Sequence, residues 1–267
     1  MNLDQKRILL TGATGGIGSA TAIKLAEAGA HLVLVGRKQD KLDALKAQLA
    51  NPGQHLTITA DLSQPDGLST LDSTCRTWRE QGIRIDVVIN NAGTNQFAYL
   101  SQRLGASIEQ EFQLNLITPV LLSQKALGWI NRPGIILNVG STFGAIGYPG
   151  FSTYCAAKAA LHRFSEAMQR ELQGAGIQML YLAPRATATR LNDDRVTALN
   201  DALGNNTDQP ETVAAAITTA LRKESTCTWL GWPEKLFVRL NQLLPGLVSS
   251  SIRKQHSRIT EFVSKTL

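Results

Sequence analysis

Long apolar runs are missing from this chain of 267 residues, and so is any group of closely spaced cysteines. No stretch approaches the roughly 18 uninterrupted apolar residues that a membrane-spanning helix requires. The three cysteines are scattered singly, and the four histidines lack the spacing of metal ligands. The first residues show no long apolar run after their charges, which does not fit a secretory signal. We therefore expect a cytoplasmic protein without disulfides and without a metal site.

Positive charge is concentrated near the C-terminus. The formal net charge is +6, and the cations from residue 234 onward are accompanied only by Glu234 and Glu261. Charge alone permits nucleic-acid binding, but no recognised nucleic-acid-binding motif accompanies it, so we expect no nucleic-acid partner. The cations of this segment are Lys235, Arg239, Arg253, Lys254, Arg258 and Lys265.

Short apolar runs alternate with amphipathic stretches along most of the chain, of which 43% is hydrophobic. Helical patterns such as 41–49 and 164–172 fill most of the gaps between the apolar runs. This alternation predicts an α/β fold, a doubly wound Rossmann-type parallel sheet with helices on both faces. The strand-like runs are 8–10, 32–35, 56–59, 87–90, 135–139 and 177–182, with a weaker one at 226–230.

Two later segments depart from this alternation. Residues 186–208 are polar, rich in Thr and Asn, and weakly periodic, which is typical of a lid or binding loop, with a disordered insert as the alternative. Residues 233–267 carry apolar residues at helical spacing with cations between them. We assign residues 1–232 to the Rossmann-type domain and 233–267 to a C-terminal amphipathic helical extension of it. Such a helix packs over the pocket, forms a subunit interface, or lies on an anionic membrane, and we favour packing or dimerisation.

A glycine-rich turn follows the first strand-like run. Gly12, Gly16 and Gly18 precede a helical pattern that stops near Gly29. Free N–H groups at a helix N-terminus bind anions, and the missing side chains let a pyrophosphate approach. Because Gly15 also lies in the run, the spacing fits both Gly-x-x-x-Gly-x-Gly and Gly-x-x-Gly-x-x-Gly. The turn predicts a nucleotide-binding site.

Ser141, Tyr154 and Lys158 form the pattern most informative about chemistry. Tyr154 and Lys158 are four residues apart, so on a helix they project from one face. A phenol has a pKa near ~10, and an adjacent ammonium would stabilise its phenolate and bring it into working range. Ser141 follows a strand-like run, where its hydroxyl could share a substrate oxygen with Tyr154. The pattern predicts acid–base catalysis at an oxygen atom, the alternative being a tyrosine that only packs on a helix.

The glycine turn, the Asn-Asn-Ala-Gly segment at 90–93 and the Ser141, Tyr154 and Lys158 pattern together resemble the short-chain dehydrogenase/reductase family. The resemblance covers roughly residues 5–230 and is closest to the compact, single-domain branch. It implies a nicotinamide dinucleotide bound across the carboxyl ends of the strands. The implied cofactor contacts are Gly12, Thr14, Gly15, Gly16, Ile17 and Gly18 for the pyrophosphate and ribose, Asp61 and Leu62 for the adenine, Asn90, Ala92 and Gly93 for the adenosine ribose, and Tyr154, Lys158, Pro184, Thr187 and Thr189 near the nicotinamide.

Arg185 departs from the family pattern, which commonly reads Pro-Gly-x-x-x-Thr after the sixth strand. This chain has Pro184, Arg185 and then Thr187 and Thr189. The departure leaves the local loop geometry open. It also leaves open a contact between Arg185 and an anionic group of the substrate or cofactor.

The turn after the second strand bears on the choice of dinucleotide. NAD-preferring sites place a carboxylate there to accept the ribose 2′-OH. This chain has Arg37 and Lys38 instead, and Arg37 can make charge-assisted contacts with a 2′-phosphate. We therefore predict that NADP(H) is preferred over NAD(H), unless the two cations only form a solvated loop.

Asn115 completes the catalytic tetrad that the resemblance implies. Pro119 lacks an N–H, so the carbonyl of Asn115, four residues earlier, loses its helical donor. In family enzymes a water on that carbonyl links Lys158 to solvent as a proton relay. A proline kink that only shapes packing is compatible with this role.

The implied reaction is reversible carbonyl reduction. NADPH would deliver hydride, Tyr154 the proton, and Ser141 a hydrogen bond to the developing oxyanion. The aromatic residues between 143 and 151 favour a lipophilic carbonyl or alcohol as substrate. An acyl-thioester 3-ketoreductase is the first alternative, and a non-catalytic NADP(H)-binding sensor or scaffold is the second. We expect a homodimer or homotetramer, with possible peripheral membrane contact through the C-terminal segment.

Overall fold

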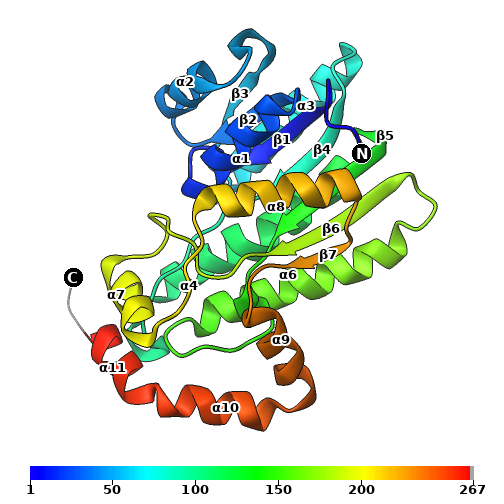
Figure 1. Cartoon of the computed structure of the whole chain (residues 1–267). Coiled ribbons are helices and arrows are strands. Elements are labelled where there is room, and N and C mark those ends of the chain that lie inside the picture. Colours follow the sequence, from blue (N-terminus) through cyan, green and yellow to red (C-terminus); the bar gives the residue numbers. More distant parts are fainter. Residues whose placement is uncertain (265–267) are drawn as a thin grey trace.

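A seven-stranded parallel sheet runs through the centre of the computed structural model, which describes residues 1–264 (Figure 1). The strand order is β3-β2-β1-β4-β5-β6-β7, and every neighbouring pair is parallel. The order reverses between β1 and β4, which opens a crevice at the carboxyl ends of these strands. The predicted fold class is confirmed. The strands are β1 (Arg7–Thr11), β2 (His31–Gly36), β3 (Leu56–Thr59), β4 (Ile85–Asn90), β5 (Ile130–Val139), β6 (Ile177–Ala183) and β7 (Cys227–Trp229).

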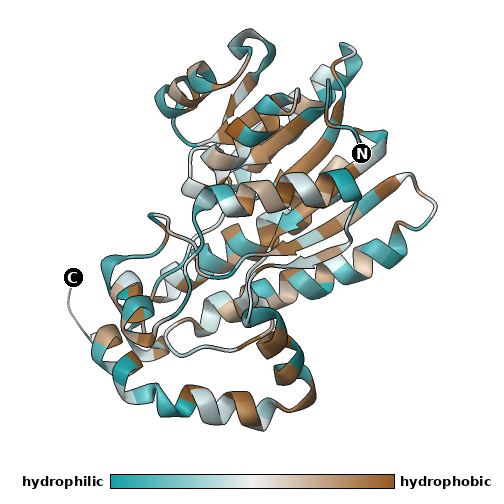
Figure 2. Ribbon diagram, viewed as in Figure 1, coloured by the Kyte–Doolittle hydropathy of each residue, from teal (hydrophilic) through white to brown (hydrophobic). Residues whose placement is uncertain are grey.

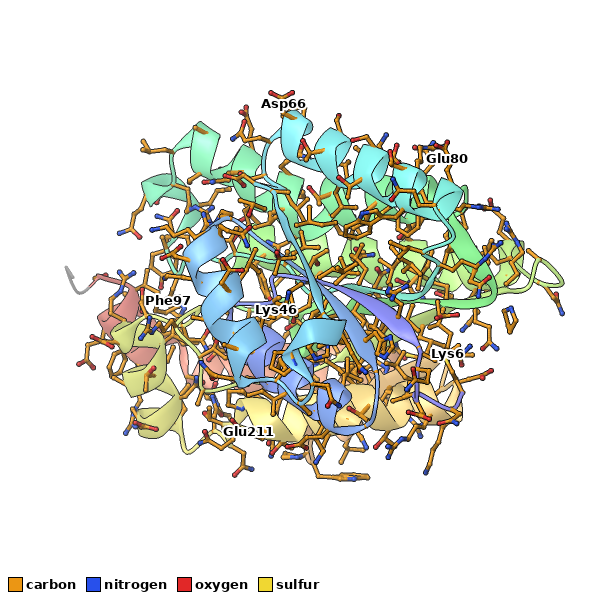
Figure 3. The ribbon with its side chains drawn as sticks, turned by 90° about the horizontal axis from the view of Figure 1, so that it is seen from above. Lys6, Lys46, Asp66, Glu80, Phe97 and Glu211 are labelled. Atoms are coloured by element: carbon orange, nitrogen blue, oxygen red, sulfur yellow. The ribbon has the colours of Figure 1, made fainter. Side chains whose placement is uncertain are left out.

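Helices cover both faces of the sheet. Alternate side chains of β1 enter separate core clusters: Ile8 and Leu10 join the one that includes α1 and α8, whereas Leu9 joins the one that includes α3, α5 and α6. Figure 3 shows α3, with Asp66 and Glu80 near its ends, on one side of the sheet and α8, marked by Glu211, on the other. The longer helices before the C-terminal segment are α1 (Gly16–Glu27), α2 (Gln39–Gln48), α3 (Pro65–Glu80), α4 (Gly105–Phe112), α5 (Thr118–Ala126), α6 (Ser152–Glu171), α7 (Asp194–Leu203) and α8 (Pro210–Lys223).

Residues 186–208 contain helix α7 and are not a structureless loop. The Asp193 carboxylate caps the helix by accepting from the Val196 N–H at 3.0 Å, and Gly204 ends it in the left-handed conformation. Val196 and Leu199, three residues apart, are buried. The polar composition hides this short apolar stripe, which is why the sequence predicted a loop here.

The C-terminal segment forms three helices, α9 (Glu234–Leu243), α10 (Pro245–Lys254) and α11 (His256–Ser264), where one amphipathic stretch was expected. The break falls at Leu244, which has φ −136° and ψ 62° and precedes a proline. Part of the segment packs on the domain, because Val238, Val248, Ile259 and Val263 are buried. Lys265 lies outside the described residues. Within residues 1–264, no helix combines the length and the apolar character needed to cross a bilayer.

Candidate active site

A cavity of about 1030 Å³ opens at the carboxyl ends of the central strands. Except for Asn90, every residue predicted for catalysis or cofactor binding lines it. The lining comes from segments far apart in the sequence, since the turns after β1, β2, β4, β5 and β6 all reach this edge of the sheet. The crevice at the switch point is therefore one continuous site.

Three glycines of the turn after β1, Gly12, Gly16 and Gly18, have no room for a side chain. Gly12 has φ +63°, and a Cβ on Gly18 would lie 2.1 Å from the Gly12 carbonyl oxygen. Helix α1 starts at Gly16, and its N-cap residue, Gly15, offers no side chain to the first N–H groups. These N–H groups and the positive end of the helix dipole adjoin the cavity. The turn thus fits the diphosphate of a dinucleotide.

Asn90 does not reach the cavity, contrary to its assignment at the adenosine ribose. Its Nδ2 donates to Asn138 Oδ1 at 2.8 Å and to Ser123 Oγ at 3.3 Å, in the sheet interior. The cavity is lined instead by Asn91, whose Nδ2 donates to the Thr11 and Gly12 carbonyls at 3.0 and 3.3 Å. Alternation along β4 explains the exchange, because neighbouring side chains point in opposite directions.

Two cations stand where β2 meets the cavity. Arg37, at the end of β2, and Lys41, in the first turn of α2, both line it. Lys38 and Asp40 do not belong to the lining. Sequence reasoning named Arg37 but missed Lys41, which lies four residues further on in the first turn of α2. Two positive charges therefore face the cavity after β2, and the carboxylate of Asp61, which also lines it, lies close enough to feel the charge of Arg37.

The carboxylate of Asp61 is fixed by the chain that follows it. Its Oδ1 accepts from the Ser63 Oγ at 2.7 Å and from the Ser63 N–H at 3.0 Å. The hydrogen bond from the Ser63 hydroxyl is the main reason that the pKa of Asp61 lies below its ordinary value. Leu62 is held in turn, since its carbonyl accepts from the Thr118 hydroxyl at 2.6 Å. Asp61 and Leu62 thus form a rigid wall where the adenine contact was predicted.

Ser141, Tyr154 and Lys158 meet in the cavity. Ser141 caps the short turn Thr142–Gly144, with its Oγ accepting from the Phe143 N–H at 3.1 Å. Tyr154 and Lys158 lie one turn apart on α6, and the Lys158 Nζ is 5.8 Å from the centroid of the Tyr154 ring. The Nζ donates to the Val139 carbonyl at the end of β5 at 3.0 Å. The structure therefore brings together the three residues of the motif.

Burial dominates the protonation of both α6 residues. It raises the pKa of Tyr154 to about 12, and a hydrogen bond with the Ser141 side chain opposes this rise. It lowers the pKa of Lys158 to about 8, because the ammonium is removed from water. The acidification of Tyr154 by Lys158 that the sequence predicted is not among the causes of this shift. At neutral pH the phenol is protonated and the lysine is cationic.

Asn115 is fully buried in a π-helical turn, Gln113–Ile117, between α4 and α5. Its Nδ2 donates to the Thr94 carbonyl at 2.7 Å, and its Oδ1 accepts from the Thr94 N–H at 3.2 Å. A Cβ on Gly93 would lie 2.8 Å from that Oδ1. The side chain thus fastens the segment after β4 beside Lys158, while Pro119 follows in the first turn of α5.

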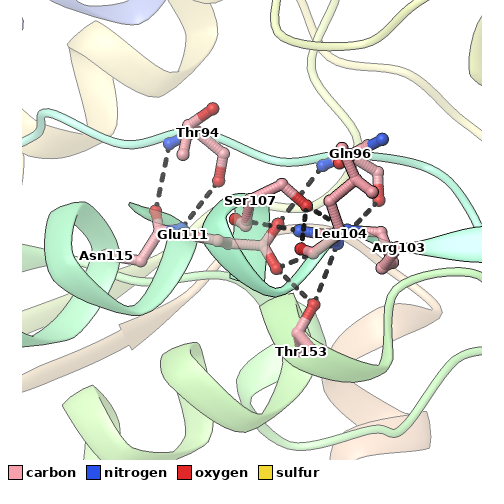
Figure 4. A network of polar contacts seen from close by, with 8 residues as sticks. All are labelled: Thr94, Gln96, Arg103, Leu104, Ser107, Glu111, Asn115 and Thr153. Carbon is pink, nitrogen blue, oxygen red and sulfur yellow. Dashed lines mark hydrogen bonds and ion pairs between the residues drawn. The ribbon is translucent and has the colours of Figure 1, made fainter. Parts of the chain in front are cut away.

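A buried ion pair, missed by sequence reasoning, supports the same segment (Figure 4). Arg103 and Glu111 are only 3% and 2% exposed, and Nη1 and Oε2 are 3.3 Å apart. Glu111 also accepts from the Gln96 N–H and from the hydroxyl of Thr153, the residue before Tyr154. Glu111 and Asn115 are four residues apart, which is the signal that could have placed both on one helix face.

Aromatic side chains form the wall beyond Tyr154. Phe143 stacks on Tyr148 with ring centroids 5.2 Å apart and contacts Phe151 at the same distance. Burial raises the pKa of Tyr148 to about 12, and its hydroxyl has no hydrogen-bond partner among residues 1–264. The C-terminal helices contribute Phe237, Val248 and Ile252 to the same cavity. This part of the site suits an apolar molecule.

Arg185 is occupied by protein contacts. Its Nη2 lies 2.8 Å from the Asp208 carboxylate, and its Nη1 lies 3.2 Å from that of Glu234. The guanidinium also donates to the Trp232 carbonyl at 3.2 Å. Arg185 thus ties the loop after β6 to the start of α9. It also lines the cavity, and its Nε has no hydrogen-bond partner among residues 1–264, so a contact with an anionic group of the substrate or cofactor stays a prediction. Residues 1–264 contain no cluster of side chains suited to a metal ion.

Comparisons with known proteins identify relatives of this chain. A model of the short chain dehydrogenase family matches residues 6–200. A 3-oxoacyl-[acyl-carrier-protein] reductase of Vibrio harveyi is 31% identical over 225 residues, which cover 81% of this chain and 90% of that protein. The structure of a short-chain dehydrogenase from Sphingobium yanoikuyae in complex with NADPH is 28% identical, with a TM-score of 0.74, over 91% of this chain and 95% of that one.

A short chain dehydrogenase/reductase from Burkholderia phymatum in complex with NAD has a TM-score of 0.81 over 92% of this chain and 96% of that one. Its identity of 20% supports a common fold alone. Fold, site and family model together define an oxidoreductase built on a Rossmann-type sheet. The chain belongs to the short-chain dehydrogenase/reductase family.

Proposed function

We propose that this enzyme interconverts a carbonyl and a primary or secondary alcohol by hydride transfer with NADP(H). One observation carries the proposal: Ser141, Tyr154 and Lys158 share a cavity with the uncapped N-terminus of α1. The glycine turn leaves space for a diphosphate at one end of the cavity. The acid–base residues line the same cavity, where a reacting oxygen would bind. Bound NADPH would supply the hydride.

Tyr154 acts as the proton donor in the reductive direction. Its pKa of about 12 keeps the phenol protonated at neutral pH, ready to give its proton to the carbonyl oxygen. The Ser141 hydroxyl donates a hydrogen bond to the same oxygen as negative charge develops there. The Lys158 ammonium stabilises the phenolate left behind and would hold the nicotinamide ribose of the bound cofactor. Asn115, at the π-helical turn, holds the water through which the lysine is reprotonated.

NADP(H) is the preferred dinucleotide in this proposal. Arg37 and Lys41 line the corner of the cavity after β2, where a ribose 2′-phosphate would lie, and both could make charge-assisted contacts with it. Asp40, the nearest carboxylate in sequence, is outside the lining. The NADPH complex of the Sphingobium relative supports this choice, and the NAD complex of the more distant Burkholderia structure leaves NAD(H) as the outcome to test.

A lipophilic substrate fits the aromatic wall formed by Phe143, Tyr148 and Phe151. The alternative, an acyl-thioester 3-ketoreductase, draws support from the activity in the name of the Vibrio relative. Arg185, which together with the basic C-terminal segment is a candidate to contact an anionic carrier, forms ion pairs with Asp208 and Glu234. We therefore favour a lipophilic ketone or alcohol. Relative rates on a long-chain ketone and on a 3-oxoacyl thioester would separate the two functions.

Subunit assembly and location complete the proposal. Ile117 and Leu121 are 41% and 36% exposed around the start of α5, and Leu104, before α4, is 76% exposed. These side chains supply an apolar surface for a homodimer or homotetramer, which sedimentation velocity would detect. We place the enzyme in the cytoplasm, within reach of a membrane surface.

Tyr154→Phe tests the function directly. We expect turnover of any accepted carbonyl to fall by about 10²- to 10⁴-fold, because the proton donor is lost. NADPH binding, followed by its fluorescence, should stay within a factor of about three, since the phenyl ring keeps its packing. Retained turnover in this variant would remove the mechanism. NADPH binding by the parent protein without turnover across a broad carbonyl panel would indicate a sensor or scaffold.

A further inference from the structure

Large apolar side chains are exposed where α9 meets α10, a corner of residues 243–247 that we name the α9–α10 tip. Leu243, Leu244 and Leu247 are 78%, 53% and 62% exposed. Figure 2 shows hydrophobic residues gathered at this corner, and Figure 1 places it at the edge of the molecule. Apolar groups grouped in this way on a soluble surface mark a contact with something apolar.

The positive charge of residues 235–260 indicates which kind of partner the tip contacts. Between Glu234 and Glu261 the sequence has no acidic residue. A second copy of the chain docked about a two-fold axis would set these cations against one another, which is unfavourable. An anionic lipid surface offers both the apolar depth and the complementary charge. The cations of this stretch are Lys235, Arg239, Arg253, Lys254 and Arg258.

The tip is presented by a fixed support. Asn241 Nδ2 donates to the Ala145 carbonyl at 2.8 Å, and the Arg185–Glu234 ion pair holds the first turn of α9. Val238 and Val248, on either side of the tip, are buried at 3% and 5% exposure. Little conformational entropy is therefore lost when the tip docks.

We propose that the α9–α10 tip docks the protein on anionic bilayers. Leu243, Leu244 and Leu247 enter the boundary between headgroups and acyl chains, while the exposed cations of α9 and α10 contact the lipid phosphates. Because Phe237, Val248 and Ile252 of the same helices line the cavity, docking brings this side of the cavity to the membrane. If the proposed function holds, on which this step rests, the substrates are carbonyl compounds dissolved in the bilayer.

Vesicle sedimentation of the full chain tests the docking without requiring turnover. We expect the protein to sediment with vesicles of phosphatidylcholine mixed with phosphatidylglycerol and to stay in solution with pure phosphatidylcholine. Leu243→Gln/Leu247→Gln should lower the partition coefficient about tenfold or more, since two apolar insertions are lost. Arg253→Gln/Lys254→Gln should lower it roughly tenfold to thirtyfold at low salt and far less at high salt.

Matched controls use the same new residue at exposed positions elsewhere. Ser249→Gln/Ser250→Gln changes two exposed polar positions of α10, and Arg222→Gln/Lys223→Gln removes an exposed pair of cations from the end of α8. Both should bind vesicles like the parent protein. All variants should keep parental melting temperatures and parental rates on a water-soluble ketone.

Three outcomes would overturn docking: no sedimentation of the parent protein with anionic vesicles, unchanged sedimentation of the leucine variant, or dissociation of a parental oligomer in that variant. The last would assign the tip to a subunit interface. Substrate delivery is tested separately with a long-chain ketone dissolved in the vesicles, on which the leucine variant should be several-fold slower. Sedimentation without any turnover would refute the proposed function and leave the docking standing.

Discussion

The wall of the cavity and the α9–α10 tip differ in what they bury: polar side chains are buried beside the wall, whereas apolar side chains are exposed at the tip. Beside the cavity, buried polar side chains hold the segment after β4: Asn115 is bonded to Thr94, and Glu111, outside the lining, to Arg103 and Thr153. At the tip, Leu243 and its neighbours stand in water. The buried polar groups fix a geometry at a cost in folding stability, because a buried ion pair seldom stabilises a fold more than apolar side chains of similar size would. The exposed side chains of the tip contribute nothing to the fold, which indicates a role outside the isolated chain.

The support of the cavity wall is therefore sensitive to single substitutions, and Glu111→Ala should have the largest effect on stability. It leaves the Arg103 guanidinium buried without its carboxylate, which costs about 3–5 kcal/mol. The matched control is Glu109→Ala, an exposed carboxylate on the same helix. Urea unfolding followed by circular dichroism measures both variants. Equal unfolding midpoints for Glu111→Ala and Glu109→Ala would show that the buried ion pair does not stabilise the segment beside the cavity.

The cofactor corner of the same wall should show an effect of intermediate size. Arg37→Ala/Lys41→Ala removes both cations after β2 and should weaken NADPH binding about ten- to hundredfold, the value of a hydrogen bond to a charged group. NADH binding should change little, because it has no 2′-phosphate. Lys38→Ala, an exposed neighbour outside the cavity, serves as the control. An equal loss of NADH and NADPH binding would show that the two cations attract either dinucleotide by charge alone and do not recognise the 2′-phosphate.

The fold and most of this wall follow from local sequence patterns. Glycines without space for a Cβ and a Tyr–Lys pair one helical turn apart depend on nearest neighbours, so their spacing is sufficient to place them. Asn90 and Asn91 could not be told apart, because which one faces the cavity depends on the pleat of β4 within the sheet. The contacts of Arg185, which the sequence left open, could not be predicted for a similar reason. Its partners Asp208 and Glu234 are distant in sequence and meet it only in the folded chain.

The wall and the tip also differ in their response to pH. The wall contains the buried Lys158, whereas residues 243–247 of the tip include no titratable side chain. With a pKa of about 8, Lys158 is cationic below that pH and neutral above it. kcat/KM for ketone reduction should therefore decline up to tenfold per pH unit above about 8, as the charge that stabilises the Tyr154 phenolate is lost. Lys158→Arg, slower overall, should show no such decline, because a guanidinium stays protonated. A decline that persists in Lys158→Arg would assign the titration to another group.

The smallest effect on folding should come from the tip itself. Leu243→Ala removes a side chain that is 78% exposed, and surface changes of this kind usually stay within about 0.5 kcal/mol. Val238→Ala, on the same helix and 3% exposed, should cost about 2 kcal/mol through the methyl groups withdrawn from the core. Urea unfolding of the two variants makes the comparison within one helix. If Leu243→Ala proved as costly as Val238→Ala, the leucine would be part of the fold, and its exposure would no longer call for a lipid surface to explain it.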